Sequence, residues 1–313
     1  YLPFDGQLGG KMESNRDASV MAIQTLADAM GIDLMAAAEG VIKIVNESMF
    51  GALRLVSVEQ GYDPRDFALV GFGGAGPLHA NALGVLTDAW PVIIPPGPGV
   101  LCAYGDATTQ VQDEAARTYL TMASDLTDAQ LAEDLHELRT RAGDALLKDN
   151  IPASEHEITY QADLRYAGQA FQITIDFTDA ELMENGVALL TDQFDAEHEQ
   201  LFTFKLDDGH EILMIRAVAK AKAKSIAERQ IGETGLSLEE CKLLASRFYY
   251  EGDWYDANIY DRSKLNVGLE IPGPAIVGEM DSTTVVLPGY VAVVDAFGNL
   301  LINPQASLVK GGK

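Results

Sequence analysis

The chain has 313 residues, of which 47% are hydrophobic, and its mean hydropathy is +0.02. This composition is typical of a folded globular protein rather than of a disordered chain. Asp and Glu number 47 against 22 Lys and Arg, and the net charge of −25 would repel a phosphate backbone, so nucleic-acid binding is disfavoured. No apolar run reaches the ~18 residues of a membrane span, and we expect no membrane partner.

The two cysteines, Cys102 and Cys241, lie in no CxxC or metal-type spacing. They favour a reducing compartment, so we expect a cytoplasmic protein without a disulfide scaffold. His198 and His210 belong to no H-x-x-x-H helix and have no third ligand nearby in sequence, so we predict no metal site. The chain begins at Tyr1 and shows no charged-then-apolar leader, which favours part of a longer polypeptide.

The first third of the chain alternates predicted helices and strands, which is an α/β pattern. The expected elements, in chain order, are a helix over residues 14–30, a second helix capped by Asp33 and ended by Gly61, a short strand over 67–72, a helix with Pro77 as its first residue, and a brief buried strand in the stretch PVIIPPGPG.

The pattern changes near residue 108, where we place a domain boundary. The elements expected beyond it are a helix over 127–150, a hairpin over 157–177 with its turn at Ala167–Gly168, a helix over 179–202, a strand over 211–222, and short strands within 246–262, 273–279, 282–288 and 291–302. We therefore predict an α/β domain over residues 1–107 and a strand-rich α+β domain over residues 108–313.

The stretch DFALVGFGGAGPLHA, residues 66–80, matches G-x-G-x-x-G with Gly71, Gly73 and Gly76. A dinucleotide site also needs an acidic residue about 20 positions on, at the end of the next strand, but PPG stands there at 95–97. No Lys-Ser or Lys-Thr follows the loop, which excludes a P-loop. Two interpretations stay open: a bare backbone and helix N-terminus that bind an anion, or tight strand-to-helix packing without a ligand.

The segment RLVSVEQGYDPRDFALVGFGGAGPLHANAL, residues 54–83, closely resembles the hydantoinase A/5-oxoprolinase family. That family also includes the ATP-dependent subunits of acetone and acetophenone carboxylases. The similarity continues in PPGPGVLCAYG, where Cys102 replaces the usual Ser, and in GPAIVGEMDSTTVVLPGYVAVVDAFGNLLI near the C-terminus. It covers essentially the whole chain.

Members of this family resemble the actin, Hsp70 and sugar-kinase ATPases in fold, and a glycine loop in the second lobe of that fold contacts the nucleotide. The resemblance assigns this role to Gly73, Gly74, Ala75 and Gly76, with ATP and Mg²⁺ as cofactors. Residues 1–107 would then end the actin-like ATPase domain. No Asp-x-Gly-Gly-Thr phosphate segment occurs in the sequence, so we expect the chain alone to hydrolyse ATP poorly or not at all.

Four further residues are weaker site candidates. Asn46 and Glu47 lie on the helix before the loop, where actin-like folds often place adenosine contacts. His79, just after the loop, is a candidate proton donor or hydrogen-bond partner, although helix packing is the favoured interpretation. Asp106 is a candidate cleft residue, although a turn-stabilising role is favoured.

The resemblance implies an enzyme that uses ATP to activate a carbonyl or enol oxygen by phosphorylation, with a hydantoinase B-like partner subunit completing the reaction. We expect hydrolysis of a cyclic amide, such as hydantoin, N-methylhydantoin, 5-oxoproline or another lactam. The alternative within the family is ATP-dependent ketone carboxylation. The alternative from another class is a non-catalytic module that binds a partner subunit and no nucleotide.

Overall fold

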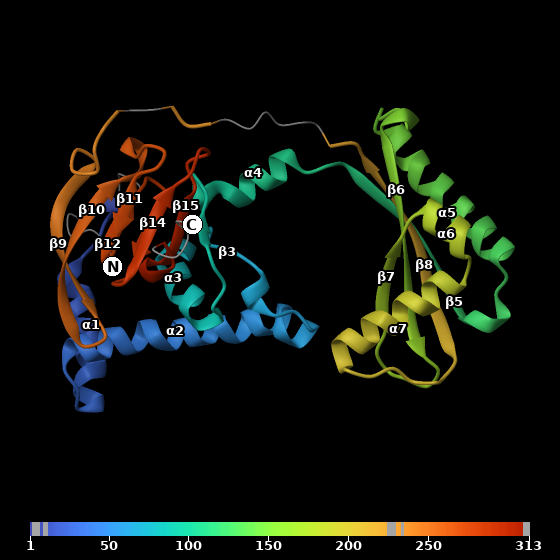
Figure 1. The fold of residues 1–313 in the computed structure, drawn as a ribbon, viewed down its shortest axis with the longest axis horizontal. Helices are drawn as coiled ribbons and strands as arrows, with labels where there is room; N and C mark the ends of the chain where they lie inside the picture. The colour runs from blue at the N-terminus through green and yellow to red at the C-terminus, as the bar shows by residue number, and fades with distance from the viewer. Residues whose placement is uncertain (2–6, 9–11, 224–229, 233–234, 309–313) are drawn as a thin grey trace. The chain divides into compact units, whose positions relative to one another are not determined.

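The computed structural model describes residues 1, 7–8, 12–223, 230–232 and 235–308 and divides into two compact units, both drawn in Figure 1. One unit combines Tyr1–Ala107 with Ala227–Lys313, and the other is Thr108–Ile226. The boundary predicted near residue 108 is where the second unit begins. The chain after residue 226 returns to the first unit, so residues 108–313 are not one compact body; as a family domain, that range stays a prediction.

The first unit contains mostly helices in its N-terminal part and strands in its C-terminal part. The N-terminal elements are β1 (Gln7–Leu8), β2 (Met12–Glu13), α1 (Arg16–Met30), α2 (Leu34–Val56), β3 (Leu69–Val70), α3 (Gly76–Thr87), β4 (Val92–Ile94) and α4 (Leu101–Thr108). The C-terminal elements are β9 (Lys242–Tyr250), β10 (Asp253–Asp261), β11 (Glu270–Pro272), β12 (Ala275–Gly278), β13 (Thr283–Val286), β14 (Tyr290–Val294), β15 (Leu300–Pro304) and α8 (Gln305–Leu308).

Strand pairing explains why the C-terminal part returns to the first unit. One sheet has the order β11-β14-β15-β4-β3, in which β15 is antiparallel to β4 and β4 is parallel to β3. A second sheet has the order β13-β12-β10-β9. Helix α3 contacts β3, β4 and β13, and so touches strands of both sheets. The segments with the family resemblance therefore lie together, although they are far apart in sequence.

The helix starts at Asp33 and Thr127 match the prediction, whereas the end of the second helix differs from it. The Asp33 carboxylate accepts hydrogen bonds from the backbone N–H groups of Met35 and Ala36, as expected for the cap of α2. Contrary to the prediction, Gly61 does not end α2: α2 ends at Val56, and Gly61, with a φ of 77°, ends the 3₁₀ turn Val58–Gln60 that follows. Thr127 caps α5 with a capping box.

The second unit is a four-stranded antiparallel sheet with helices packed against it. Its elements are β5 (Gln112–Met122), α5 (Asp128–Lys148), β6 (His156–Tyr166), β7 (Ile173–Phe177), α6 (Asp179–Asn185), α7 (Ala188–Phe202) and β8 (His210–Ala221), and the strand order is β5-β8-β6-β7. The helix predicted over 179–202 is broken in two, because Gly186 adopts a φ of 61° between α6 and α7.

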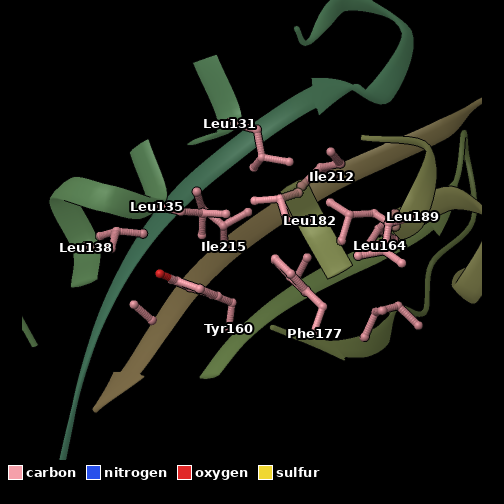
Figure 2. Packing of buried hydrophobic residues seen from close by; sticks show 14 of the residues in the cluster. Leu131, Leu135, Leu138, Tyr160, Leu164, Phe177, Leu182, Leu189, Ile212 and Ile215 are labelled. Atoms are coloured by element: carbon pink, nitrogen blue, oxygen red, sulfur yellow. The ribbon is translucent and has the colours of Figure 1, made fainter. Parts of the chain in front are cut away.

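One hydrophobic core holds the second unit together, and Figure 2 shows it from close by. Leu131, Leu135 and Leu138 of α5 are buried at three-to-four spacing and face the strands (Figure 2). They meet Ile212 and Ile215 of β8, which are both fully buried. This periodicity explains why α5 was predictable from the sequence.

Within the described ranges, no single helix is both long and apolar enough to cross a membrane. The segments Arg16–Met30 and Leu34–Gln60 reach the required length and hydropathy only when taken together, and the chain bends by 94° between them.

Candidate functional site

The glycine loop, residues 71–76, connects β3 to α3. Glycine is required at positions 71 and 73 for different structural reasons. Gly71 has no room for a side chain, since a Cβ atom would lie 2.6 Å from the Ala80 Cβ and 2.7 Å from the Ile94 Cδ1. Gly73 adopts a φ of +83°, which favours glycine. Close packing therefore accounts for Gly71, and the turn accounts for Gly73.

Neither reason accounts for Gly74 and Gly76. Both have ordinary φ values, and the nearest atom to an added Cβ would be 3.5 Å away for Gly74 and 3.8 Å away for Gly76. Gly74 is exposed, and α3 begins at Gly76, one residue before the predicted start at Pro77. The loop thus presents bare backbone beside a helix N-terminus, an arrangement that suits an approaching anion.

Two other turns support the glycine loop, and we call the three together the three-turn junction (residues 71–76, 95–99 and 279–282). The Gly73 N–H donates to the Pro98 carbonyl at 2.7 Å. The Ser282 hydroxyl donates to the Gly74 carbonyl at 3.2 Å.

The second and third turns of the junction also contact each other directly. The Gly97 N–H donates to Glu279 Oε2 at 3.3 Å. A Cβ atom on Gly99 would lie 2.6 Å from the carbonyl oxygen of Asp281. Glycine at position 99 therefore permits the close approach of the turn that follows β12.

A largely buried pair of charged side chains, Arg262 and Glu279, adjoins these turns. The Arg262 side chain is 8% exposed and donates hydrogen bonds to the carbonyl oxygens of Ile94, at 2.9 Å, and Gly298, at 2.8 Å. Its Nη1 lies 3.6 Å from Glu279 Oε1. Burial raises the pKa of Glu279, with the Asp281 charge adding to the rise and Arg262 opposing it. Arg262 thus joins the end of β4 to the turn after β12.

The structure brings together two of the predicted site residues on neighbouring helices. His79 Nδ1 of α3 lies 2.8 Å from Asn46 Oδ1 of α2, and Asn46 is buried. An amide oxygen only accepts hydrogen bonds, so this contact favours the tautomer with hydrogen on Nδ1. Burial lowers the pKa of His79 below its ordinary value of 6.5, which keeps the imidazole neutral at pH 7. The contact agrees with the packing interpretation of His79.

The other two weaker candidates lie at the surface. Glu47 is exposed on α2. Asp106 is exposed within α4, so the turn-stabilising role favoured from the sequence is wrong. Residues 101–108 contain no proline and continue the 3₁₀ turn at 98–100 directly into a helix.

Replacing Asn46 by Asp is expected to raise the pKa of His79, because a carboxylate beside the ring favours the imidazolium. The wild-type histidine has a folded pKa below the unfolded one, so its contribution to stability is lost as the pH falls below about 6.5. In the N46D variant this loss should shrink or reverse. An NMR titration of the His79 ring measures the change, and N46L, which removes the acceptor, should produce no rise. An unchanged pKa in N46D would contradict the contact.

His198 and His210, for which no metal site is predicted, hydrogen-bond to protein groups in the structure. His198 Nδ1 lies 2.8 Å from the Phe204 carbonyl oxygen, and His210 Nε2 lies 2.7 Å from Asp195 Oδ1. The Tyr166 hydroxyl donates to the same Asp195 oxygen at 2.7 Å. In the part of the chain that the structure describes, no three His, Cys, Asp or Glu side chains are grouped to hold a metal ion.

Sequence reasoning missed the residues that build the junction around the glycine loop. Arg262, Glu279, Asp281 and Ser282 are more than 180 residues away from that loop in the chain, and no local periodicity connects them to it. The available signal was the C-terminal family-like stretch, which contains three of these four residues.

The fold and the junction together define a mixed α/β protein with an open glycine loop, and sequence comparison identifies its family. Residues 1–115 match the hydantoinase/oxoprolinase family, and residues 121–302 match the hydantoinase/oxoprolinase C-terminal domain. The chain belongs to the hydantoinase/oxoprolinase family.

Several relatives share most of this chain. An uncharacterised protein of Methanocaldococcus jannaschii is 33% identical over 297 residues, 94% of this chain and 42% of that protein. Caprolactamase subunit alpha of Pseudomonas jessenii is 29% identical, over 97% of this chain and 45% of that subunit. Acetone carboxylase beta subunit of Xanthobacter autotrophicus is 28% identical, over 92% of this chain and 42% of that subunit. The chain spans less than half the length of these relatives.

The structural comparison agrees with the sequence comparison. The crystal structure of ATP-dependent caprolactamase from Pseudomonas jessenii matches with a TM-score of 0.81 and 28% identity, over 97% of this chain and 45% of that chain. The predicted mixture of helices and strands therefore matches the architecture of a solved member of the family.

Proposed function

We propose that the polypeptide containing this chain is an ATP-dependent hydrolase of cyclic amides. It would activate the amide carbonyl oxygen by phosphorylation and act with a hydantoinase B-like partner subunit in the cytoplasm. The observation that carries the proposal is the bare backbone of residues 73–76, exposed at Gly74 and Ala75, at the N-terminus of α3 in a chain whose fold matches an ATP-dependent caprolactamase. Lactam opening in that relative supports a lactam or related ring as the substrate.

In this proposal the first unit is the second-lobe part of an actin/Hsp70-like ATPase fold. Residues 73–76 would hold the nucleotide through backbone N–H groups, and the positive end of the α3 dipole would favour its phosphates. When bound, ATP supplies the phosphoryl group that makes a poor electrophile reactive. The described residues show no ligand cluster for Mg²⁺, so we assign no residue of this chain to the metal.

Ketone carboxylation is the second candidate function, because the acetone carboxylase beta subunit matches 92% of this chain at nearly the same identity as the caprolactamase subunit. Both activities begin with ATP-dependent activation of an oxygen atom, and the glycine loop would serve either. The substrate therefore decides between the two proposals.

The test is to purify the full-length subunit with its hydantoinase B-like partner and to measure ADP binding and ATP hydrolysis. We expect ADP to bind and a cyclic amide, from a series of hydantoin, N-methylhydantoin, 5-oxoproline and caprolactam, to stimulate ATP hydrolysis. Stimulation by acetone or acetophenone with bicarbonate, and by none of the cyclic amides, would establish the carboxylase. Absence of nucleotide binding would leave the non-catalytic partner-binding module. The isolated 313-residue chain should hydrolyse ATP poorly or not at all.

A further inference from the structure

The sequence has no acidic residue at the end of the strand that follows the glycine loop. In nucleotide-binding units built as strand, glycine loop, helix and strand, a carboxylate at the carboxyl end of the second strand accepts hydrogen bonds from the ribose hydroxyls. Here β3 and β4 are neighbouring parallel strands joined through α3. The turn at the carboxyl end of β4, residues 95–99, contains only proline and glycine.

The structure places an acidic residue at this position from a distant part of the chain. Asp281, in the turn between β12 and β13, packs directly on the end-of-β4 turn. A Cβ atom on Gly99 would lie 2.8 Å from both the Cβ and the Oδ2 of Asp281, and a Cβ atom on Gly97 would lie 4.0 Å from the same Oδ2. The Asp281 carbonyl oxygen also lies 3.5 Å from the Cβ position of Gly74. Asp281 therefore lies beside both glycine-containing turns of the junction.

The Asp281 carboxylate also has acceptor capacity that the described residues do not use. Its Oδ2 is buried and has no hydrogen-bond partner among them. The nearby guanidinium of Arg262 donates through Nη2 to two backbone carbonyls. Its Nη1 pairs with Glu279 at 3.6 Å and makes no hydrogen bond to Asp281 among the described residues. A buried carboxylate oxygen without a donor is costly, and native proteins keep such groups mainly where they have a role.

We infer that Asp281 accepts hydrogen bonds from the ribose hydroxyls of the nucleotide bound over residues 73–76. This inference rests on the proposed function. A carboxylate repels phosphate and attracts hydroxyl donors, so Asp281 orients the nucleoside end while the N-terminus of α3 faces the phosphates. Ser282 and Glu279 hold the turn in place through their bonds to Gly74 and Gly97. They act as positioning residues.

The experiment compares ADP with 2′,3′-dideoxy-ADP by isothermal titration calorimetry on the full-length subunit with its partner. Wild-type protein should bind ADP at least about tenfold more tightly than the dideoxy analogue, because the analogue has no ribose hydroxyls. In D281A the two affinities should become equal, through loss of ADP affinity with little change for the analogue. D281N keeps one acceptor oxygen and should be intermediate, and it replaces D281A if that variant fails to fold.

Two controls separate binding from folding. D253N changes an exposed acid on β10 and should leave both affinities unchanged. Thermal unfolding of D281N should show no loss of stability, because the substitution removes a buried charge whose Oδ2 has no hydrogen-bond donor. Discrimination between the nucleotides that persists in folded D281A, or that stays at the wild-type level in folded D281N, overturns the inference. Wild-type protein that binds neither nucleotide overturns the proposed function instead.

Discussion

Replacing Arg216 by methionine is expected to lower the free energy of unfolding of the second unit by about 3 kcal/mol or more. Arg216 on β8 forms an ion pair with Asp163 on β6, whose side chain is only 2% exposed. The Thr174 hydroxyl donates to the other Asp163 oxygen at 2.7 Å. Removing the arginine leaves the buried carboxylate with the Thr174 hydroxyl as its donor and without its paired charge. Removing one partner of a buried ion pair in this way strongly destabilises the fold.

Urea unfolding of the second unit, followed by circular dichroism, measures this change. Arg139→Met is a matched control, because Arg139 pairs with Asp179 at the surface, where the two side chains are 48% and 44% exposed. That control should cost less than about 1 kcal/mol. Adding Asp163→Asn to Arg216→Met should recover part of the loss. If the two arginine variants were equally stable, the buried pair would not have the role assigned to it.

Replacing Gly74 by leucine is expected to weaken ADP binding by at least about tenfold, which corresponds to about 1.4 kcal/mol. The fold should tolerate the change, because Gly74 is exposed, its φ is ordinary, and the nearest atom to an added Cβ is the Asp281 carbonyl oxygen at 3.5 Å. A side chain there would instead occupy the space above the loop through which a ligand approaches the backbone.

Two glycine variants should therefore separate loss of ADP affinity, measured by calorimetric titration, from loss of stability, measured by thermal unfolding. Gly74→Leu should change affinity with little change in melting temperature. Gly71→Ala should lower the melting temperature, because its Cβ would meet Ala80 and Ile94 at less than 3 Å. Unchanged ADP affinity in Gly74→Leu would remove the nucleotide assignment from this loop and favour the packing interpretation.

Elements with local signals could be predicted from the sequence. The caps Asp33 and Thr127 bond backbone groups two or three residues away, and the buried leucines of α5 repeat at helical spacing, so each signal fits within one short window. Strand β5 was missed, because its charged and polar residues alternate poorly and its pairing shifts register between Thr118 and Thr121.

The glycine loop itself could be found in the sequence, but its surroundings could not. The loop and its helix are contiguous, whereas the three-turn junction depends on β4 pairing with β15, some 200 residues later. Whether Gly74 lies against a side chain or against open space depends on such long-range contacts. The hydrogen bond between Asn46 and His79 likewise required the packing of α2 on α3, which the sequence left undetermined.

The strand order of the second unit brings its two chain connections together. The first strand, β5, and the last, β8, are direct neighbours, and Gln112 lies opposite Lys220. The Ala221 N–H donates to the Val111 carbonyl at 2.8 Å. The points where the chain enters and leaves the unit are therefore side by side, an arrangement that lets one domain be inserted within another. The C-terminal strands can thus complete the first unit's sheet after an interruption of more than 100 residues.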